Sequence, residues 1–194
     1  FPLAGRMAHA GVDAARRSPH LAFEGVHAHL GSQLFDLSVY RPAAEVLADF
    51  AMEVGPEDIT TVDIGGGLGI AYTAEDRPPS VDTFVETLAE AVHDAWRARG
   101  LPLPRLVTEP GRSIAGRAGV TLYRVGAIKP IEGVRTYASV DGGMSDLLRP
   151  MLYGAVYEPL VANKADAEPT NVVRLVGKHC ESSDVLVGEA HLPP

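Results

Sequence analysis

The sequence predicts a parallel α/β fold over about the first 117 residues, followed by a mostly β segment. Helix-like and strand-like stretches alternate in the first part, in the order helix, strand, helix, strand, helix, strand. The expected strand ends near His29, Gly65 and Glu109 are 36 and 44 residues apart, which suits units of strand, crossover helix and strand. After Gly116, short β-like runs lie between Gly, Pro and charged residues. An α/β barrel and a doubly wound sheet both fit this pattern.

Three stretches have the character of helices. Residues 5–17 are rich in Ala and Arg. Residues 39–54 carry apolar side chains at helical spacing and stop at Gly55-Pro56. Residues 81–99 follow a break at 77–80 and place their large apolar side chains on one side. We therefore expect three crossover or flanking helices.

Three short stretches in the first part are typical of strands. Residues 23–30 alternate in character, residues 60–64 are β-branched and run into three glycines, and residues 105–108 precede a Glu-Pro-Gly turn. We place a domain boundary between residues 117 and 118, so that 1–117 forms the α/β part and 118–194 the β part. The β candidates of the second part are residues 120–128, 137–140, 172–176 and 185–187.

Composition excludes several classes of protein. The 194 residues carry a net charge of −8, which argues against a nucleic-acid or anionic-membrane surface as the main partner. One cysteine excludes an internal disulfide framework and a multi-cysteine metal cluster. No apolar run approaches the roughly 18–20 residues that span a bilayer. We expect a cytoplasmic protein and, because the sequence opens on Phe1 rather than Met, a piece of something longer.

Polar clusters follow each of the three expected parallel strands, where sites are built in α/β folds. The histidines of 27–33 point the same way on a strand and suit either metal ligation or a structural role. The glycines of 63–69 suit either an anion-binding loop or a tight turn. Glu109 and Arg112 are either a surface ion pair or, beside a phosphate-type loop, an acid and a phosphate- or carboxylate-binding guanidinium.

Two more polar clusters lie in the β-rich part. Residues 141–146 lead to Arg149, Tyr153 and Tyr157, and residues 178–184 hold the single cysteine, Cys180. A lone cysteine is most often a small buried apolar residue. Its polar neighbours here make a reactive thiol an equal alternative.

These clusters together resemble the diaminopimelate decarboxylases, within the pyridoxal-phosphate decarboxylases and racemases built on an alanine-racemase-like barrel. The first three are shared with ornithine- and arginine-type decarboxylases, and the Cys-Glu pair is similar to the diaminopimelate enzymes in particular. The motifs, in family order, are His-Ala-His-Leu-Gly-Ser-Gln (27–33), Asp-Ile-Gly-Gly-Gly-Leu-Gly (63–69), Glu-Pro-Gly-Arg (109–112), Val-Asp-Gly-Gly-Met-Ser-Asp (140–146) and Gly-Lys-His-Cys-Glu-Ser (177–182).

The resemblance implies the last part of a pyridoxal-phosphate-binding (β/α)8 barrel followed by part of a C-terminal β domain. It implies that His29 stacks on the pyridine ring and that Glu109 faces the pyridine nitrogen. A carboxylate there keeps the nitrogen protonated, so the ring accepts the electrons left when CO2 departs. The phosphate-binding residues implied are Ser32, Gly65, Gly66, Gly67, Gly111 and Arg112.

The resemblance also implies a substrate, meso-2,6-diaminopimelate, converted to L-lysine and CO2 in the last step of lysine biosynthesis. Cys180 matches the residue that donates a proton to the carbanion, and its loop reaches into a neighbouring subunit, so the resemblance implies a homodimer with shared sites. The positions that match substrate-binding residues are Arg112, Arg149, Tyr153 and Glu181.

Two departures from the family pattern stand out. The family's Schiff-base lysine has no counterpart among Lys129, Lys164 and Lys178, so we expect these 194 residues alone to be inactive. Ser183 replaces the glycine usual after Cys-Glu-Ser. Two alternatives stay open: a decarboxylase of another basic amino acid, of the arginine or ornithine type, and a non-catalytic pyridoxal-phosphate-binding barrel protein.

Overall fold

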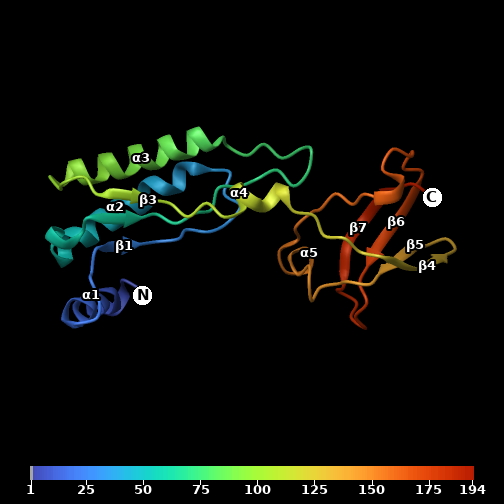
Figure 1. Cartoon of the computed structure of the whole chain (residues 1–194), viewed down its shortest axis with the longest axis horizontal. Coiled ribbons are helices and arrows are strands. Elements are labelled where there is room, and N and C mark those ends of the chain that lie inside the picture. Colours follow the sequence, from blue (N-terminus) through green and yellow to red (C-terminus); the bar gives the residue numbers. More distant parts are fainter. Residues whose placement is uncertain (1) are drawn as a thin grey trace. The chain divides into compact units, whose positions relative to one another are not determined.

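The computed structural model describes residues 2–194, which form two compact units (Figure 1). Unit 1 comprises the chain up to Ile70 together with Arg77–Ala118. Unit 2 comprises Gly119–Pro194 and the short segment Ala71–Asp76.

Unit 1 contains a three-stranded parallel sheet in the order β1-β2-β3, as the alternation of elements predicts. His27 pairs with Asp63, and Asp63 pairs with Val107, so the three strands end side by side. The elements are α1 (Met7–Arg17), β1 (Gly25–His27), α2 (Tyr40–Val54), β2 (Thr61–Asp63), α3 (Val81–Ala98), β3 (Arg105–Val107) and the short helix α4 (Arg112–Ala115).

The core of unit 1 forms where α2 and α3, which lie side by side in Figure 1, pack with the sheet. Helix α3 begins because Ser80 Oγ accepts a hydrogen bond from the Thr83 N–H at 3.0 Å. Its buried residues Phe84, Leu88 and Trp96 recur at helical spacing on one face. The sheet is thereby held against two helices, and the ends of its strands are placed at fixed positions.

Unit 2 is a four-stranded sheet in the order β4-β5-β6-β7. Strand β4 is antiparallel to β5, β5 is parallel to β6, and β6 is antiparallel to β7. The mostly β character expected for this part is confirmed. The elements are β4 (Val125–Ile131), β5 (Arg135–Val140), the short helix α5 (Arg149–Tyr153), β6 (Asn171–Val176) and β7 (Val185–Leu192).

The first strand of unit 2 lies later in the chain than the sequence pattern predicts, because residues 120–124 are outside the ladder. Side chains bind much of this segment: Asp141 Oδ1 accepts from the Arg124 N–H at 2.8 Å, and Tyr123 donates to Asp146 Oδ2 at 2.6 Å. The Arg124 carbonyl also accepts from the Asp141 backbone N–H at 3.1 Å. Strand β4 is an edge strand, which is where the proline at position 130 is tolerated.

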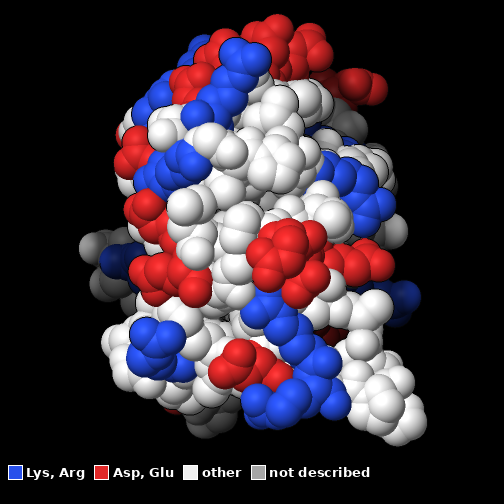
Figure 2. All heavy atoms as spheres, turned by 90° about the vertical axis from the view of Figure 1, so that its left-hand side faces the viewer, with Lys and Arg blue, Asp and Glu red and all other residues white. Residues whose placement is uncertain are grey.

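Charged side chains of both signs are interspersed on the end of unit 1 seen in Figure 2, around an uncharged central area. That face offers no large patch of a single sign, the feature that attracts a polyanion or polycation. Within residues 2–194, none of the helices is both long and apolar enough for a membrane span.

Candidate active site

The carboxyl ends of the unit 1 strands bring together three of the motifs found in the sequence. The chain leaves β1 toward His29, leaves β2 into Gly65-Gly66-Gly67 and leaves β3 toward Glu109. The Glu109 N–H donates to the Gly65 carbonyl at 2.9 Å, so the loops after β2 and β3 are bound to each other. Parallel pairing of the strands therefore places three segments that are distant in the sequence side by side at one edge of the sheet.

Gly66 allows the closest of these approaches. A side-chain Cβ at this position would lie 2.1 Å from the carbonyl oxygen of Glu109, well inside van der Waals contact. Gly65, whose φ is +74°, would place a Cβ 2.9 Å from His29 Nδ1. The two glycines are needed because the backbone itself, without side chains, forms this part of the edge.

The ring of His29 is oriented by the glycine loop. The Gly66 N–H donates to His29 Nδ1 at 3.3 Å, which makes Nδ1 the acceptor and leaves the ring hydrogen on Nε2. The side chain is otherwise exposed. One face of the ring is therefore free to lie against a planar ligand.

Two side chains beneath the edge hold the glycine loop in place. The hydroxyl of Tyr40, a fully buried residue of α2, donates to the Gly66 carbonyl at 2.8 Å. Thr108 Oγ1 donates to the Gly65 carbonyl at 2.7 Å. These two side chains thus supply hydrogen-bond donors for the Gly66 and Gly65 carbonyls, which lie beyond the end of β2.

Gln33 connects Arg112 to the same edge. Its amide nitrogen donates to the Ile70 carbonyl at 2.6 Å, and its amide oxygen accepts from the Ile70 N–H at 3.2 Å. The same oxygen accepts from Arg112 Nη1 at 3.1 Å. Arg112 is thus anchored by a side chain that is itself fixed at both ends.

His27, Asp63 and Glu109 form a cluster of potential ligands at the ends of the strands. One nitrogen or oxygen of each lies within 4.8 Å of the others. His27 Nε2 is 3.4 Å from Glu109 Oε2, and Asp63 Oδ1 accepts from the Gly65 N–H at 2.9 Å. Such a donor set suits a small cation or a network in which one carboxylate is oriented by its neighbours.

Two of the predicted phosphate-binding residues are exposed and make few contacts through their side chains. Ser32 is exposed, and within residues 2–194 its side chain has no hydrogen-bond partner. Gly111 is also exposed, and a Cβ there would meet nothing within 4 Å. Its carbonyl accepts from the Ile114 N–H at 3.1 Å and so starts helix α4.

In unit 2, Asp184 joins the two motif-bearing loops. It is 2% exposed, and its carboxylate accepts from the Met144 N–H at 2.7 Å and the His179 N–H at 2.9 Å. Gly143 and Gly177 leave room for it, since a Cβ at either would lie within 3 Å of the carboxylate. A buried acid therefore helps to bind the loop with Cys180 to the loop of 141–146, alongside the Lys178 N–H, which donates to the Gly142 carbonyl at 2.9 Å.

The Cys180–Glu181 loop presents a thiol and a carboxylate to solvent. Hydrogen bonds from the backbone N–H of Ser183 and from Ser182 lower the pKa of Glu181. Glu181 is thus ionised at neutral pH and can bind an ammonium group. Ser183 departs from the family pattern, yet its backbone N–H supplies one of these bonds.

Arg149 lies among tyrosines in unit 2. Its guanidinium is 5.4 Å from the ring centre of Tyr153 and 5.9 Å from that of Tyr72, which in turn packs edge-on against Tyr157. Its Nε is buried and has no hydrogen-bond partner within residues 2–194. An unsatisfied buried donor on a cation suits an anionic ligand such as a carboxylate.

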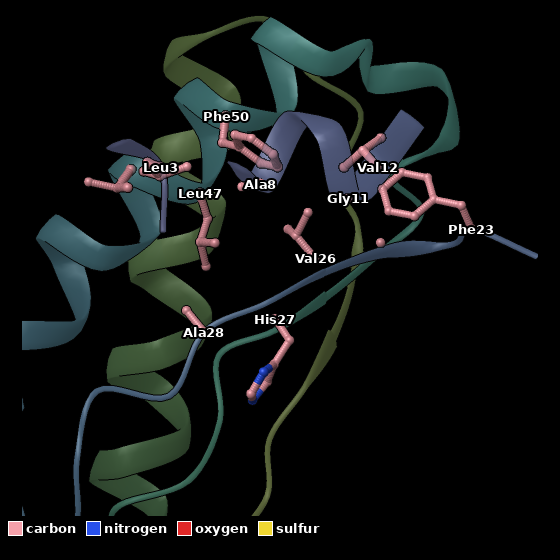
Figure 3. Close-up of a pocket in the computed structure, with 12 residues that line it drawn as sticks. Leu3, Ala8, Gly11, Val12, Phe23, Val26, His27, Ala28, Leu47 and Phe50 are labelled. Atoms are coloured by element: carbon pink, nitrogen blue, oxygen red, sulfur yellow. The ribbon is translucent and has the colours of Figure 1, made fainter. Parts of the chain in front are cut away.

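A separate pocket of about 360 Å³ lies in unit 1 between α1, β1 and α2 (Figure 3). Its lining is apolar apart from His27, whose ring points away from Val12 and Phe50 in that view. It contains no set of convergent polar groups, and the edge described above is the better candidate for chemistry.

Residues 4–116 match the family model described as "Pyridoxal-dependent decarboxylase, pyridoxal binding domain". The chain belongs to the pyridoxal-dependent decarboxylases. The match covers unit 1 with its whole glycine-lined edge. The resemblance expected from the motifs is confirmed, and so is the pyridoxal cofactor class.

Relatives of this decarboxylase chain match it over nearly its full length. The diaminopimelate decarboxylase of Mycobacterium tuberculosis is 44% identical over 198 residues, covering 95% of this chain and 44% of the relative. The Helicobacter pylori diaminopimelate decarboxylase complexed with L-lysine superposes with a TM-score of 0.76 at 31% identity, covering 96% of this chain and 44% of that one. A Vibrio vulnificus lysine/ornithine decarboxylase complexed with cadaverine gives 0.71 at 26% identity, covering 96% and 49%. The chain thus spans less than half the length of these proteins.

The decarboxylase edge in unit 1 fits a phosphate-bearing pyridine cofactor. The backbone of the glycine loop packs too closely against its neighbours to admit a Cβ, and the Gly67 N–H has no partner within the described residues. Arg112 supplies a cation, His29 a planar ring, and Glu109 a carboxylate that is exposed at this edge. Backbone N–H groups, a guanidinium and an acid are the donors and acceptor that such a cofactor requires.

Several residues that shape the decarboxylase site were not singled out by the sequence patterns. Asp63 and Gln33 lie inside the quoted motifs, so position in a motif was the available signal, whereas the sequence pattern indicated only a metal-ligating or a structural role for His27. Tyr40 and Asp184 carry no such signal for this role, because only the folded chain decides which hydroxyl lies under the loop and which acid is buried.

Proposed function

We propose that the whole protein carrying this chain decarboxylates meso-2,6-diaminopimelate to L-lysine with pyridoxal phosphate as cofactor. The observation that carries the proposal is the edge of unit 1, where an acid, a glycine loop and an oriented histidine lie together. The 44% identity to a diaminopimelate decarboxylase supports the choice of substrate. The similarity to a lysine-complexed enzyme supports the choice of product.

The residues of unit 1 have distinct roles in this proposal. His29 lies against the cofactor ring, Arg112 and the unpartnered Gly67 N–H hold the phosphate, and Glu109 binds the pyridine nitrogen. When bound, pyridoxal phosphate supplies a ring that accepts the electron pair left by the departing CO2. Glu109 favours this outcome because a carboxylate partner keeps the nitrogen protonated. The further phosphate-binding residues we propose are Ser32, Gly65, Gly66, Gly67 and Gly111.

The residues of unit 2 account for a substrate with a zwitterionic far end. Arg149, with its unpartnered buried Nε, and Tyr153 bind a carboxylate, and the ionised Glu181 binds an ammonium. Fixing that end positions the carbon that reacts. Cys180, an exposed thiol, donates the proton that replaces the lost carboxyl group.

We also propose that the protein acts as a homodimer and that its cofactor-binding part ends at residue 117, with the β part starting at 118. Unit 2 supports an interface because large apolar side chains are exposed on it, among them Val120 at 86%, Leu122 at 78% and Leu160 at 70%. Analytical ultracentrifugation of the full-length protein should give twice the chain mass. A monomer at micromolar concentration would contradict the dimer.

A second candidate substrate class is that of ornithine and lysine, favoured by the similarity to the Vibrio vulnificus enzyme. Arg149, with its unpartnered buried Nε, argues for diaminopimelate, because the far end of diaminopimelate carries a carboxylate that ornithine and lysine lack. The discriminating experiment is a panel of meso-diaminopimelate, lysine, ornithine and arginine, with CO2 release measured for the full-length protein. Preference for a substrate without the distal carboxylate would overturn our choice.

The Glu109→Arg variant tests the role of the acid. We expect CO2 release to fall by roughly 100-fold or more, the scale on which loss of one positioned electrostatic group acts. Glu168→Arg, at an exposed position, is the control for the change of charge. Turnover of Glu109→Arg close to that of the unchanged protein would contradict the role given to the acid.

A further inference from the structure

The carboxylate of Glu109 has one partner in the described part of the chain. His27 Nε2 lies 3.4 Å from Glu109 Oε2, and no other hydrogen bond or ion pair to this carboxylate occurs within residues 2–194. Both side chains are about half exposed, at 51% and 54%. A half-exposed glutamate without a second contact retains considerable rotational freedom.

The strand register explains why His27 is the residue in this position. His27 ends β1 opposite Asp63 of β2, and Asp63 is opposite Val107 of β3, two residues before Glu109. Side chains separated by two residues on an extended strand point to the same face. The register therefore directs His27 and Glu109 to one side of the sheet edge.

Asp63 makes the contact between His27 and Glu109 more important. One carboxylate oxygen of Asp63 lies within 4.8 Å of a ring nitrogen of His27 and of a carboxylate oxygen of Glu109. Asp63 Oδ1 also accepts a hydrogen bond from the Gly65 N–H. The two carboxylates repel each other at this separation. The imidazole of His27, 3.4 Å from Glu109 Oε2, is the one side chain of the described residues close enough to pair with this carboxylate and so to limit its orientations.

We propose that His27 is a positioning residue that orients the Glu109 carboxylate toward the pyridine nitrogen of bound pyridoxal phosphate. This inference rests on the proposed function and adds to it a residue that touches neither the substrate nor the cofactor. His27 acts by limiting the orientations of Glu109, so its loss affects the protonation of the ring nitrogen more than the binding of the phosphate.

The test uses full-length protein loaded with pyridoxal phosphate labelled with 15N in the ring. In His27→Phe, which keeps a ring but has no N–H, the 15N resonance should move toward that of the unprotonated pyridine. The kcat should fall roughly 10- to 100-fold, as for a misplaced catalytic group, with KM changed less than about twofold. His27→Gln, whose amide can reach the same place, should restore most of both readouts.

A matched control is available on α3. His93 Nδ1 lies 3.5 Å from Asp94 at exposures of 43% and 55%, so His93→Phe removes a similar exposed pair away from the edge. It should leave the resonance and kcat unchanged. In a Glu109→Gln background, His27→Phe should have no further effect on the resonance.

The outcomes separate the two proposals. If the unchanged protein binds no pyridoxal phosphate or releases no CO2 from any of the four amino acids, the proposed function fails. If the unchanged protein is active and His27→Phe has the same 15N resonance and kcat, only the role of His27 is overturned. A His27→Phe protein that loses the resonance shift but is not restored by His27→Gln would also overturn it.

Discussion

At the scale of single residues, Asp184 is notable as a buried acid that binds two loops of unit 2. It is the one charged side chain among residues 2–194 that is buried, and both of its carboxylate oxygens accept backbone N–H groups. Its own backbone carbonyl accepts from the Gly177 N–H at 2.9 Å. Asp184 thus links the loop of Cys180 to residues 141–146, together with the Lys178 N–H, which donates to the Gly142 carbonyl at 2.9 Å.

The substitution Asp184→Asn should destabilise unit 2 by about 2–3 kcal/mol, because an amide NH2 would face a backbone N–H and leave a buried donor unsatisfied. Urea unfolding measures the loss. The alkylation rate of Cys180 by a maleimide should also rise as its loop loosens.

Asp166→Asn is the control, since Asp166 is exposed and lies in a turn between the strands. It should be neutral in both measurements. A neutral Asp184→Asn would show that the buried carboxylate is not needed to bind the loops.

At the scale of elements, the contact between the loops after β2 and β3 forms the proposed cofactor-binding edge. Gly66 lets the backbone of Glu109 approach, and Tyr40 from α2 supports the same loop from below. The position of the glycine loop therefore depends both on helix α2 and on the loop that follows β3. The cofactor edge follows from this packing and not from any one motif.

We expect Gly66→Ala to cost about 1–3 kcal/mol, because a methyl group 2.1 Å from a carbonyl oxygen forces the two loops apart. The affinity for pyridoxal phosphate, followed by fluorescence titration, should fall at least about 10-fold, since the cradle depends on close backbone approach.

Gly188→Ala in β7 is the matched control, because a Cβ there meets nothing within 4 Å. If Gly66→Ala and Gly188→Ala bind pyridoxal phosphate equally well, the close approach of the Gly66 and Glu109 backbones is not needed for cofactor binding.

At the scale of the whole molecule, the 194 residues contain three lysines, and none belongs to unit 1. Lys129, Lys164 and Lys178 all follow the residues that match the pyridoxal-binding domain. The chain by itself should therefore release no CO2 from diaminopimelate and form no borohydride-stable adduct with pyridoxal phosphate. Mass spectrometry after borohydride treatment checks this, and an adduct on Lys178 would contradict it.

Much of the fold followed from local patterns because the relevant signals are local. The apolar face of 81–99, the β-branched run before the triple glycine and the alternation of elements predicted the parallel sheet of unit 1. The segment 120–124 shows the limit. Its β-like composition is overruled by hydrogen bonds that its Arg124 N–H and Tyr123 hydroxyl donate to the carboxylates of Asp141 and Asp146, more than fifteen residues away in the chain.

The sequence by itself determined the family, the cofactor class and the residue types at the site, because these depend on motifs that are contiguous in the chain. Only the tertiary structure decided that Tyr40 supports the glycine loop, that Asp184 is buried and that His27 contacts Glu109. Those facts depend on strand register and on burial, which arise when segments some 26 to 82 residues apart pack together. The physical reason is that a side chain's chemistry is set by its neighbours in space.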